Sequence, residues 1–252
     1  DFSDGANPVA GLINVNGKLY GTTYEGGTYS NGTVFRISQT GKEHVMYSFG
    51  YAYDGANPLA PLVYAQGRLY GTTIFGGTSM PYPGGTVFSM TLTGKEKVLH
   101  DFGNHHDGAY PWAGLTYARN KLYGTTESGG TRNAGTVFRI TLSGAEKVLH
   151  DFSGPDGKYP YSKLLKVNDT LYGTTFTGGG YKCDRGESCG TVFSMTTDGA
   201  ESVLHTFGTY PDGAGPYSSL IEVRGSLYGT TAKGGAHNHE KGGDGTVFAL
   251  TR

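Results

Sequence analysis

Short runs rich in apolar residues, separated by glycine-bearing turns, recur from one end of the chain to the other. Four such runs lie in the stretch 57–102, at 57–64, 68–73, 85–90 and 96–102. They are rich in Val, Leu, Tyr, Phe and Thr, which favour strands, and glycines such as Gly67 and Gly94 lie in the turns between them. No stretch keeps apolar residues at helical spacing for three turns. The pattern therefore predicts an all-β chain.

The group of four runs is repeated five times. Each copy contains Tyr-Gly-Thr-Thr, then a pair of glycines, then Gly-Thr-Val-Phe, and the copies lie ~50 residues apart. Tyr-Gly-Thr-Thr begins at Tyr20, Tyr70, Tyr123, Tyr172 and Tyr228, and Gly-Thr-Val-Phe begins at Gly32, Gly85, Gly135, Gly190 and Gly245. One four-stranded meander cannot bury both of its faces, and radial stacking of several meanders solves this problem. We therefore predict a five-bladed β-propeller with four-stranded antiparallel blades.

The ends of the chain fall at different points of the repeat. We expect a single domain over residues 1–252, with units at roughly 3–49, 50–102, 103–152, 153–207 and 208–252. Asp1-Phe2 aligns with the end of a fourth strand, as in Asp101-Phe102, whereas the last three residues align with the end of a third strand. The fifth blade is therefore expected to lack its outer strand unless further chain completes it. An open edge of this kind is a template for pairing with another chain.

The repeated motifs resemble those of a known family. Leu-Tyr-Gly-Thr-Thr, Gly-Gly, Gly-Thr-Val-Phe and Val-Leu-His-x-Phe are similar to the GloVer-type repeat of secreted and surface-anchored bacterial proteins, and the resemblance covers essentially the whole chain. It implies a propeller fold and an extracellular location, secreted or at the cell surface. It implies no general enzymatic activity.

The two cysteines support an extracellular location. Cys183 and Cys189 flank a short insertion that only the fourth unit carries. Two cysteines so close together are expected to form a local disulfide, which persists in oxidising compartments. The alternative is half of a metal site, but no second pair of Cys or His lies nearby in the sequence.

Composition excludes two classes of partner. The 252 residues include 20 Lys and Arg and 21 Asp and Glu, and the lysines are scattered singly. Nucleic-acid binding would need a clustered basic patch, so no nucleic-acid partner is expected. No apolar run is long enough to span a bilayer, so we expect no membrane span.

Several polar residues recur at fixed places in the repeat. An aspartate precedes glycine in every unit, and a ring of such carboxylates could bind a metal or serve as acid and base. The alternative is an Asx-turn, in which the side chain caps local backbone amides. This second interpretation is favoured because all five units share the aspartate. His100, His150 and His205 also occupy one repeat position, where the first unit has Tyr47, so a structural role is expected for them too.

Residues that depart from the repeat are better candidates for function. Units three to five carry aromatic residues around the proline that begins the innermost strand, whereas units one and two do not. Aromatic rings with polar edges suit the flat apolar faces of sugars and other small ligands, although packing between blades would also explain them. We predict a ligand site at the mouth of the propeller channel, made by Tyr110, Trp112, Tyr159, Tyr161 and Tyr217, with His105 and Asp107 nearby.

Catalysis is a weaker prediction. No catalytic residue is assigned, because no pair of carboxylates stands out from the repeat positions as acid and nucleophile. His237, His239 and Glu240 could hold a divalent metal, but a solvated loop is the commoner role for such a run, so no metal and no cofactor are expected.

Three functional classes follow. The first is a binding module for glycans or small polar ligands. The second is a structural protein that self-associates through the open blade edge. The third is a glycan-acting enzyme. Few residues of catalytic type are unique to one unit, which favours binding or structure over catalysis.

Overall fold

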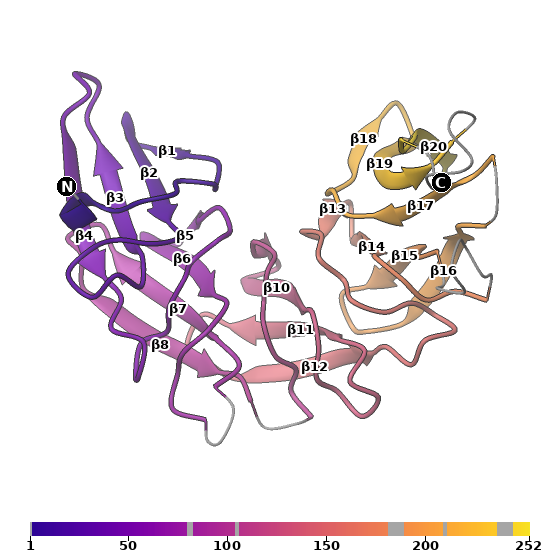
Figure 1. Cartoon of the computed structure of the whole chain (residues 1–252), viewed down its shortest axis with the longest axis horizontal. Helices are drawn as coiled ribbons and strands as arrows, with labels where there is room; N and C mark the ends of the chain where they lie inside the picture. Colours follow the sequence, from indigo (N-terminus) through magenta and orange to yellow (C-terminus); the bar gives the residue numbers. More distant parts are fainter. Residues whose placement is uncertain (1, 80–82, 104–105, 181–188, 209–210, 236–243) are drawn as a thin grey trace. The chain divides into compact units, whose positions relative to one another are not determined.

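The computed structural model describes residues 2–79, 83–103, 106–180, 189–208, 211–235 and 244–252 (Figure 1). Within these ranges the chain is all-β apart from the single 3-10 turn η1 (Phe2–Asp4). No helix in the same ranges is long and apolar enough to cross a membrane.

The strands form five sheets. The first contains β1 (Ile13–Val15), β2 (Lys18–Thr23), β3 (Thr33–Ile37) and β4 (Glu43–Ser48). The second contains β5 (Val63–Ala65), β6 (Arg68–Thr73), β7 (Thr86–Thr91) and β8 (Glu96–Asp101). The third contains β9 (Thr116–Ala118), β10 (Lys121–Thr126), β11 (Thr136–Thr141) and β12 (Glu146–Asp151). The fourth contains β13 (Leu165–Val167), β14 (Thr170–Thr175), β15 (Thr191–Thr196) and β16 (Glu201–Thr206). The fifth contains β17 (Gly213–Pro216), β18 (Ile221–Val223), β19 (Ser226–Gly234) and β20 (Val247–Thr251).

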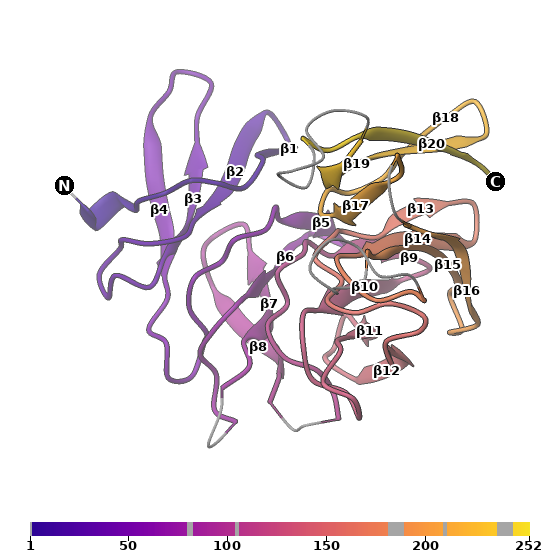
Figure 2. The ribbon, with the colours of Figure 1, turned by 45° about the vertical axis from the view of Figure 1, so that its right-hand side comes forward.

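The first four sheets are meanders, with their strands ordered as they occur in the chain. The strand pairs are antiparallel, and a register shift falls between the Val and Phe of Gly-Thr-Val-Phe, as at Val87 and Phe88. The two views show these strands side by side as short twisted ribbons (Figures 1 and 2). Five sheets of four antiparallel strands confirm the predicted fold class, a five-bladed β-propeller of four-stranded blades.

The fifth sheet departs from the others, as the sequence predicted. Its order is β17-β19-β18, and β20 also pairs with β19. β17 lies in the segment that precedes the innermost strand of the fifth repeat, and it pairs with β19. In the second repeat the equivalent segment makes the isolated bridge Ala56↔Phe75 instead of a strand. Among the described residues, no strand of this sheet corresponds to the outer strands β4, β8, β12 and β16.

The chain divides into two compact units. One comprises residues 1–124 and 139–147, and the other comprises residues 125–138 and 148–252. In the first compact unit, one hydrophobic core is shared by two consecutive sheets. Its buried side chains are Val15, Tyr20, Val34 and Phe49 from the first repeat and Leu62, Leu69, Phe88 and Met90 from the second. In the second unit, Val192 and Phe207 of the fourth repeat pack in the same way with Leu220 and Leu227 of the fifth.

The glycine of Tyr-Gly-Thr-Thr is explained by close packing. Gly71 lies opposite Phe88 in the antiparallel pair β6–β7. A Cβ atom at Gly71 would lie 2.6 Å from Cζ of Phe88, and the same clash would arise at Gly173 with Phe193. The phenylalanine of Gly-Thr-Val-Phe therefore lies flat over the glycine of the neighbouring strand, which couples the two motifs in each repeat.

Replacing Gly71 by alanine is therefore expected to destabilise the protein by about 1–2 kcal/mol, because the Phe88 ring must leave its position in a close-packed core. Urea unfolding followed by tyrosine fluorescence measures the effect. Gly180→Ala is the matched control, because a Cβ atom there would meet nothing within 4 Å. An equal loss in both variants would contradict this explanation.

Candidate functional site

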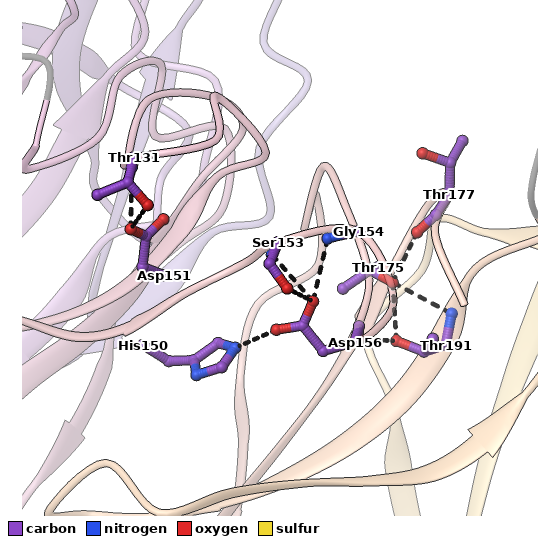
Figure 3. Close-up of polar contacts among 9 residues, drawn as sticks. All are labelled: Thr131, His150, Asp151, Ser153, Gly154, Asp156, Thr175, Thr177 and Thr191. Atoms are coloured by element: carbon purple, nitrogen blue, oxygen red, sulfur yellow. Dashed lines mark hydrogen bonds and ion pairs between the residues drawn. The ribbon is translucent and has the colours of Figure 1, made fainter. Parts of the chain in front are cut away.

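The aspartate before glycine caps the turn between consecutive sheets. Asp156 accepts hydrogen bonds from the backbone nitrogens of Ser153 at 2.9 Å and Gly154 at 3.1 Å, and from Nε2 of His150 at 2.8 Å (Figure 3). Burial raises the pKa of the Asp156 carboxyl, but the hydrogen bonds from Ser153 and His150 outweigh it and hold this pKa below its usual value. The Asp156 carboxylate is therefore ionised and hydrogen-bonded within the turn, which it stabilises.

The same arrangement recurs in the other units. Asp54, Asp107 and Asp212 each accept a hydrogen bond from a backbone nitrogen a few residues earlier. In the first unit the hydroxyl of Tyr47 donates to Asp54 at 2.6 Å, in the place of the histidine that pairs with aspartate elsewhere. These contacts confirm the Asx-turn interpretation for four of the five aspartates and the structural interpretation of the repeated histidines.

The paired-glycine loops are tied to the outer strands. Asp151, the last residue of β12, accepts hydrogen bonds from the backbone nitrogen of Thr131 at 2.9 Å and from its hydroxyl at 2.6 Å (Figure 3). Asp101 binds Thr78 in the same way in the second unit. A side chain at Gly130 would collide with the Asp151 carboxylate, which explains the second glycine of the pair. These contacts also belong to the scaffold.

Residues that break the repeat gather in the second compact unit. The rings of Tyr161 and Tyr217 are stacked, with centroids 5.0 Å apart and planes at 30°. Phe176 meets both rings edge-on, with centroids 5.6 Å from Tyr161 and 6.0 Å from Tyr217. Tyr217 is 50% exposed, so the cluster presents part of an aromatic surface to solvent.

An acidic residue completes this cluster. The Tyr161 hydroxyl donates a hydrogen bond to Oε1 of Glu127 at 2.7 Å. Burial, followed by this hydrogen bond, raises the pKa of Tyr161 above its usual value. Burial and the nearby charge of Glu127 also raise the pKa of Tyr217. Both phenols therefore stay neutral at physiological pH, with Glu127 as a hydrogen-bond acceptor beside them. We call Glu127, Tyr161, Phe176 and Tyr217 the aromatic cluster.

The remaining predicted site residues are divided between the two compact units. Tyr110, Trp112 and Asp107 lie in the first compact unit, where Tyr110 packs edge-on against Phe75 at 5.6 Å. Trp112 is half-buried, and its backbone nitrogen donates to the Tyr110 carbonyl at 3.0 Å. Tyr159 lies in the second unit with Tyr161 and Tyr217.

Three of the predicted features fall outside the described residues. They are His105, the run from His237 to Glu240, and Cys183. The bond between Cys183 and Cys189 therefore stays a prediction. Within the described ranges, no group of three or more His, Cys, Asp or Glu side chains is placed to hold a metal ion.

Sequence reasoning missed Glu127 and Phe176 as members of the cluster. Both follow Gly-Thr-Thr directly, at a position where the other units have Tyr24, Ile74 and Ala232. The variability of this position was the available signal. It becomes informative once the structure shows that this position lies beside the aromatic residue of the next repeat, Tyr161 for Glu127 and Tyr217 for Phe176.

Two tyrosines adopt an unusual backbone conformation. Tyr110 and Tyr159 have φ values of 60° and 58°, in the left-handed region that disfavours bulky side chains. The equivalent residues in the other units are Asn7, Asn57 and Gly215, which tolerate this region well. The third and fourth repeats therefore have tyrosine at a position whose positive φ disfavours it. Such a cost is typical of positions kept for function.

Tyr159→Asn is expected to raise the free energy of unfolding by about 0.5–1 kcal/mol, because asparagine relieves the left-handed strain. Thermal or urea unfolding measures the change. Asn57→Tyr is the reciprocal variant and should destabilise the protein, since it also removes the hydrogen bond from the Asn57 side chain to the Tyr24 carbonyl at 2.9 Å. A loss of stability in Tyr159→Asn would show that packing of the ring outweighs the strain.

Comparison with solved structures shows the same fold in enzymes of low sequence identity. A gluconolactonase from Xanthomonas campestris matches with a TM-score of 0.52 and 16% identity, over 96% of this chain and 71% of that one. An exo-β-1,3-galactanase from Clostridium thermocellum matches with a TM-score of 0.52 and 14% identity, over 98% of this chain and 59% of that one. The chain thus spans about three fifths of the length of the galactanase. At this identity the likeness shows the fold alone.

Comparison of sequences gives a family. No curated protein matches this chain. The family described as the Gloeobacter/Verrucomicrobia repeat matches residues 1–187, which agrees with the GloVer-type motifs in the sequence. The match covers well over half of the 252 residues, and the chain therefore belongs to the Gloeobacter/Verrucomicrobia repeat family.

Proposed function

We propose that the chain is a binding module that takes a glycan or another small polar ligand on its aromatic cluster. The observation that carries the proposal is the stack of Tyr161 and Tyr217, with Glu127 hydrogen-bonded at its edge. Each of these residues departs from what most units have at its position, so the repeating scaffold does not account for them.

The chemistry of the cluster suits a neutral ligand rich in hydroxyl groups. The exposed part of Tyr217 offers a flat apolar face of the kind on which a sugar ring can stack. The carboxylate of Glu127 accepts hydrogen bonds, which favours hydroxyl donors and disfavours an anionic group at the same place. We therefore infer an uncharged saccharide as the preferred ligand class.

Affinity at a single cluster is expected to be low. An aromatic contact contributes about 0.5–1.5 kcal/mol beyond the burial of area, and only one ring of this stack is half exposed. Tighter binding would require a polymeric ligand that makes several contacts with the protein, because the first contact raises the effective concentration of the ligand for the next one. A polysaccharide should bind more tightly than its monosaccharide.

A glycan array followed by titration calorimetry tests the proposal. Tyr217→Ala should abolish or weaken at least tenfold the binding of any array hit and leave the unfolding curve nearly unchanged, because the ring is 50% exposed. Val9→Ala is the matched control, since Val9 occupies the same repeat position and is 62% exposed. Binding that both variants retain would place the ligand elsewhere, and an array without hits would leave the cluster as packing.

The same titrations separate binding from catalysis. If a bound glycan is converted to products and the conversion is lost in Glu127→Gln, the enzyme hypothesis replaces the binding module. Self-association through the edge of the fifth sheet is the second candidate function, because β20 pairs with β19 alone among the described strands.

We also propose that the protein works outside the cytoplasm, secreted or at the cell surface, which the expected Cys183–Cys189 bond supports. Untreated protein should show no free thiol by alkylation and mass spectrometry, and reduction should leave the sheets folded. The bond closes a short ring, so its stabilisation should lie below the ~3 kcal/mol expected for a 15-residue loop. Two alkylated cysteines in untreated protein would contradict the bond.

A further inference from the structure

Three exposed tyrosines lie in the two loops that meet at the end of β4. Tyr51 and Tyr53 are 46% and 79% exposed in the loop that follows β4, and Tyr29 is 62% exposed in the paired-glycine loop of the first repeat. All three belong to the first compact unit, and the aromatic cluster belongs to the second. We call Tyr29, Tyr51 and Tyr53 the tyrosine patch.

Polar contacts hold both loops at the end of β4. The backbone nitrogen of Thr28 donates to the Ser48 hydroxyl at 3.3 Å, and the Tyr47 hydroxyl donates to Asp54 in the following loop at 2.6 Å. Burial and the hydrogen bond to Asp54 raise the pKa of Tyr47 most, and Tyr29 makes a smaller contribution in the same direction. The phenol of Tyr29 therefore lies near that of Tyr47, between the two loops.

Tyr51 occupies a position that favours glycine. Its backbone nitrogen donates to the Gly55 carbonyl at 3.0 Å, and its carbonyl accepts from the Gly77 nitrogen at 2.9 Å. In the fourth repeat the equivalent residue is Gly154, which makes the same two kinds of hydrogen bond. Gly154 has a φ of 110° and Tyr51 has a φ of 77°. Glycine adopts such values at no steric cost, whereas a bulky side chain is disfavoured there.

Burial of the Tyr51 ring does not offset this strain. Tyr110 and Tyr159 also have positive φ values, but their side chains are less exposed than that of Tyr51. A strained backbone conformation is typical of positions that serve function. Because the Tyr51 ring is left largely in solvent, contact with a ligand explains it better than packing does.

Exposure of this loop is a property of the repeat in both compact units. Tyr53 directly precedes the aspartate that caps the turn, and the residues at this place in the other repeats are also exposed, namely Ser3, His106, Pro155 and Pro211. The second repeat alone has tyrosine there. The repeating scaffold therefore requires neither Tyr51 nor Tyr53.

We propose that the tyrosine patch is a second saccharide site, which binds sugar rings of a neutral polysaccharide. Tyrosine rings offer a flat apolar face together with a polar edge, as in the aromatic cluster. A second site gives a polymeric ligand another point of contact with the protein. The inference rests on the proposed function for the class of ligand, but it does not require the aromatic cluster to be occupied.

Fluorine NMR of the intact chain, labelled with fluorotyrosine, tests this inference. The titrants are neutral hexasaccharides of glucose, xylose, mannose and galactose, and the single variants Tyr51→Asn and Tyr53→Ser assign the two resonances. At least one hexasaccharide should shift both resonances in a saturable way. The shifts should persist in Tyr217→Ala, which lacks the exposed ring of the aromatic cluster.

Variants of the patch measure its share of the binding. In the Tyr217→Ala background, adding Tyr51→Asn and Tyr53→Ser should lower the affinity for that hexasaccharide at least tenfold. The chain should remain folded, because asparagine tolerates a positive φ and Tyr53 is largely exposed. Tyr64→Ser is the matched control, since Tyr64 is a 39% exposed tyrosine of the same compact unit outside the patch, and it should retain the affinity.

The resonances report on the two sites separately. If Tyr51 and Tyr53 do not shift with any of the four hexasaccharides, the inference is overturned, whereas a shift at Tyr217 would still support the proposed function. Shifts at Tyr51 and Tyr53 without one at Tyr217 would support the patch and remove the ligand from the aromatic cluster. An equal loss of affinity in Tyr64→Ser, or self-association that Tyr51→Asn/Tyr53→Ser abolishes, would also overturn the inference.

Discussion

Replacing Thr175 by valine is expected to lower the free energy of unfolding by about 3 kcal/mol, although the two side chains have nearly the same shape. The Thr175 hydroxyl is fully buried and takes part in three hydrogen bonds (Figure 3). It accepts from the Thr191 backbone nitrogen at 3.1 Å, pairs with the Thr191 hydroxyl at 2.8 Å and donates to the Thr177 carbonyl at 3.0 Å. Valine would leave the buried Thr191 backbone nitrogen without an acceptor and would take one of their hydrogen-bond partners from the Thr191 hydroxyl and the Thr177 carbonyl, and a buried unsatisfied group costs about 1–3 kcal/mol.

Urea unfolding of Thr175→Val measures this loss. Thr196→Val is the matched control, because the Thr196 hydroxyl accepts one hydrogen bond, from the Ala200 backbone nitrogen at 3.1 Å, on an exposed turn of the same sheet. Its cost should stay below about 1 kcal/mol, since water can satisfy the Ala200 nitrogen. If both variants lose the same small amount, the buried threonine pair does not act as a network.

The threonine network explains why the repeat could be recognised from the sequence. The pair formed by the second threonine of Gly-Thr-Thr and the threonine of Gly-Thr-Val-Phe recurs in every unit, for example Thr73 with Thr86 at 2.9 Å. The glycine of the first motif likewise needs the phenylalanine of the second. Because each motif is a local requirement of its own sheet, five copies in the sequence were enough to predict five sheets.

The aromatic cluster could be predicted only in part. Tyr161 and Tyr217 were identified because they break the repeat next to a proline, and the structure places them in contact. Glu127 and Phe176 were missed because each contacts an aromatic residue of the next repeat, Glu127 with Tyr161 and Phe176 with Tyr217. The alignment of the units gives equivalent positions within a sheet, but the packing of one sheet on another decides which positions meet.

Two half-buried glutamates are expected to make the protein less stable as the pH rises from about 5 to about 8. Glu96 and Glu146 begin the outer strands β8 and β12, and Oε1 of each is buried without a hydrogen-bond partner among the described residues. Burial, together with the nearby charge of Asp54, raises the pKa of Glu96 to about 7. Burial also raises the pKa of Glu146 to about 7, with opposing contributions from His100 and Asp107.

The sign of the effect follows from linkage. In the unfolded chain these carboxyls ionise near their ordinary pKa of 4.5, whereas in the folded protein they hold their protons to about pH 7. Their contribution to stability is therefore complete below about pH 4.5 and is lost as the pH rises through the folded value. Because both side chains are partly exposed, solvent screening should reduce the cost to about 1.5 kcal/mol each, less than half of what the full shift would give.

The double variant Glu96→Gln/Glu146→Gln should remove this pH dependence. Glutamine stays neutral, so the variant should be about 3 kcal/mol more stable than the wild type at pH 8 and nearly equal to it at pH 5, as urea unfolding at the two values would show. Glu43→Gln is the matched control, because Glu43 begins β4 at the same repeat position but is exposed. Its effect at pH 8 should be much smaller. A double variant that is no more stable than the wild type at pH 8 would mean that water solvates both carboxylates in the folded protein.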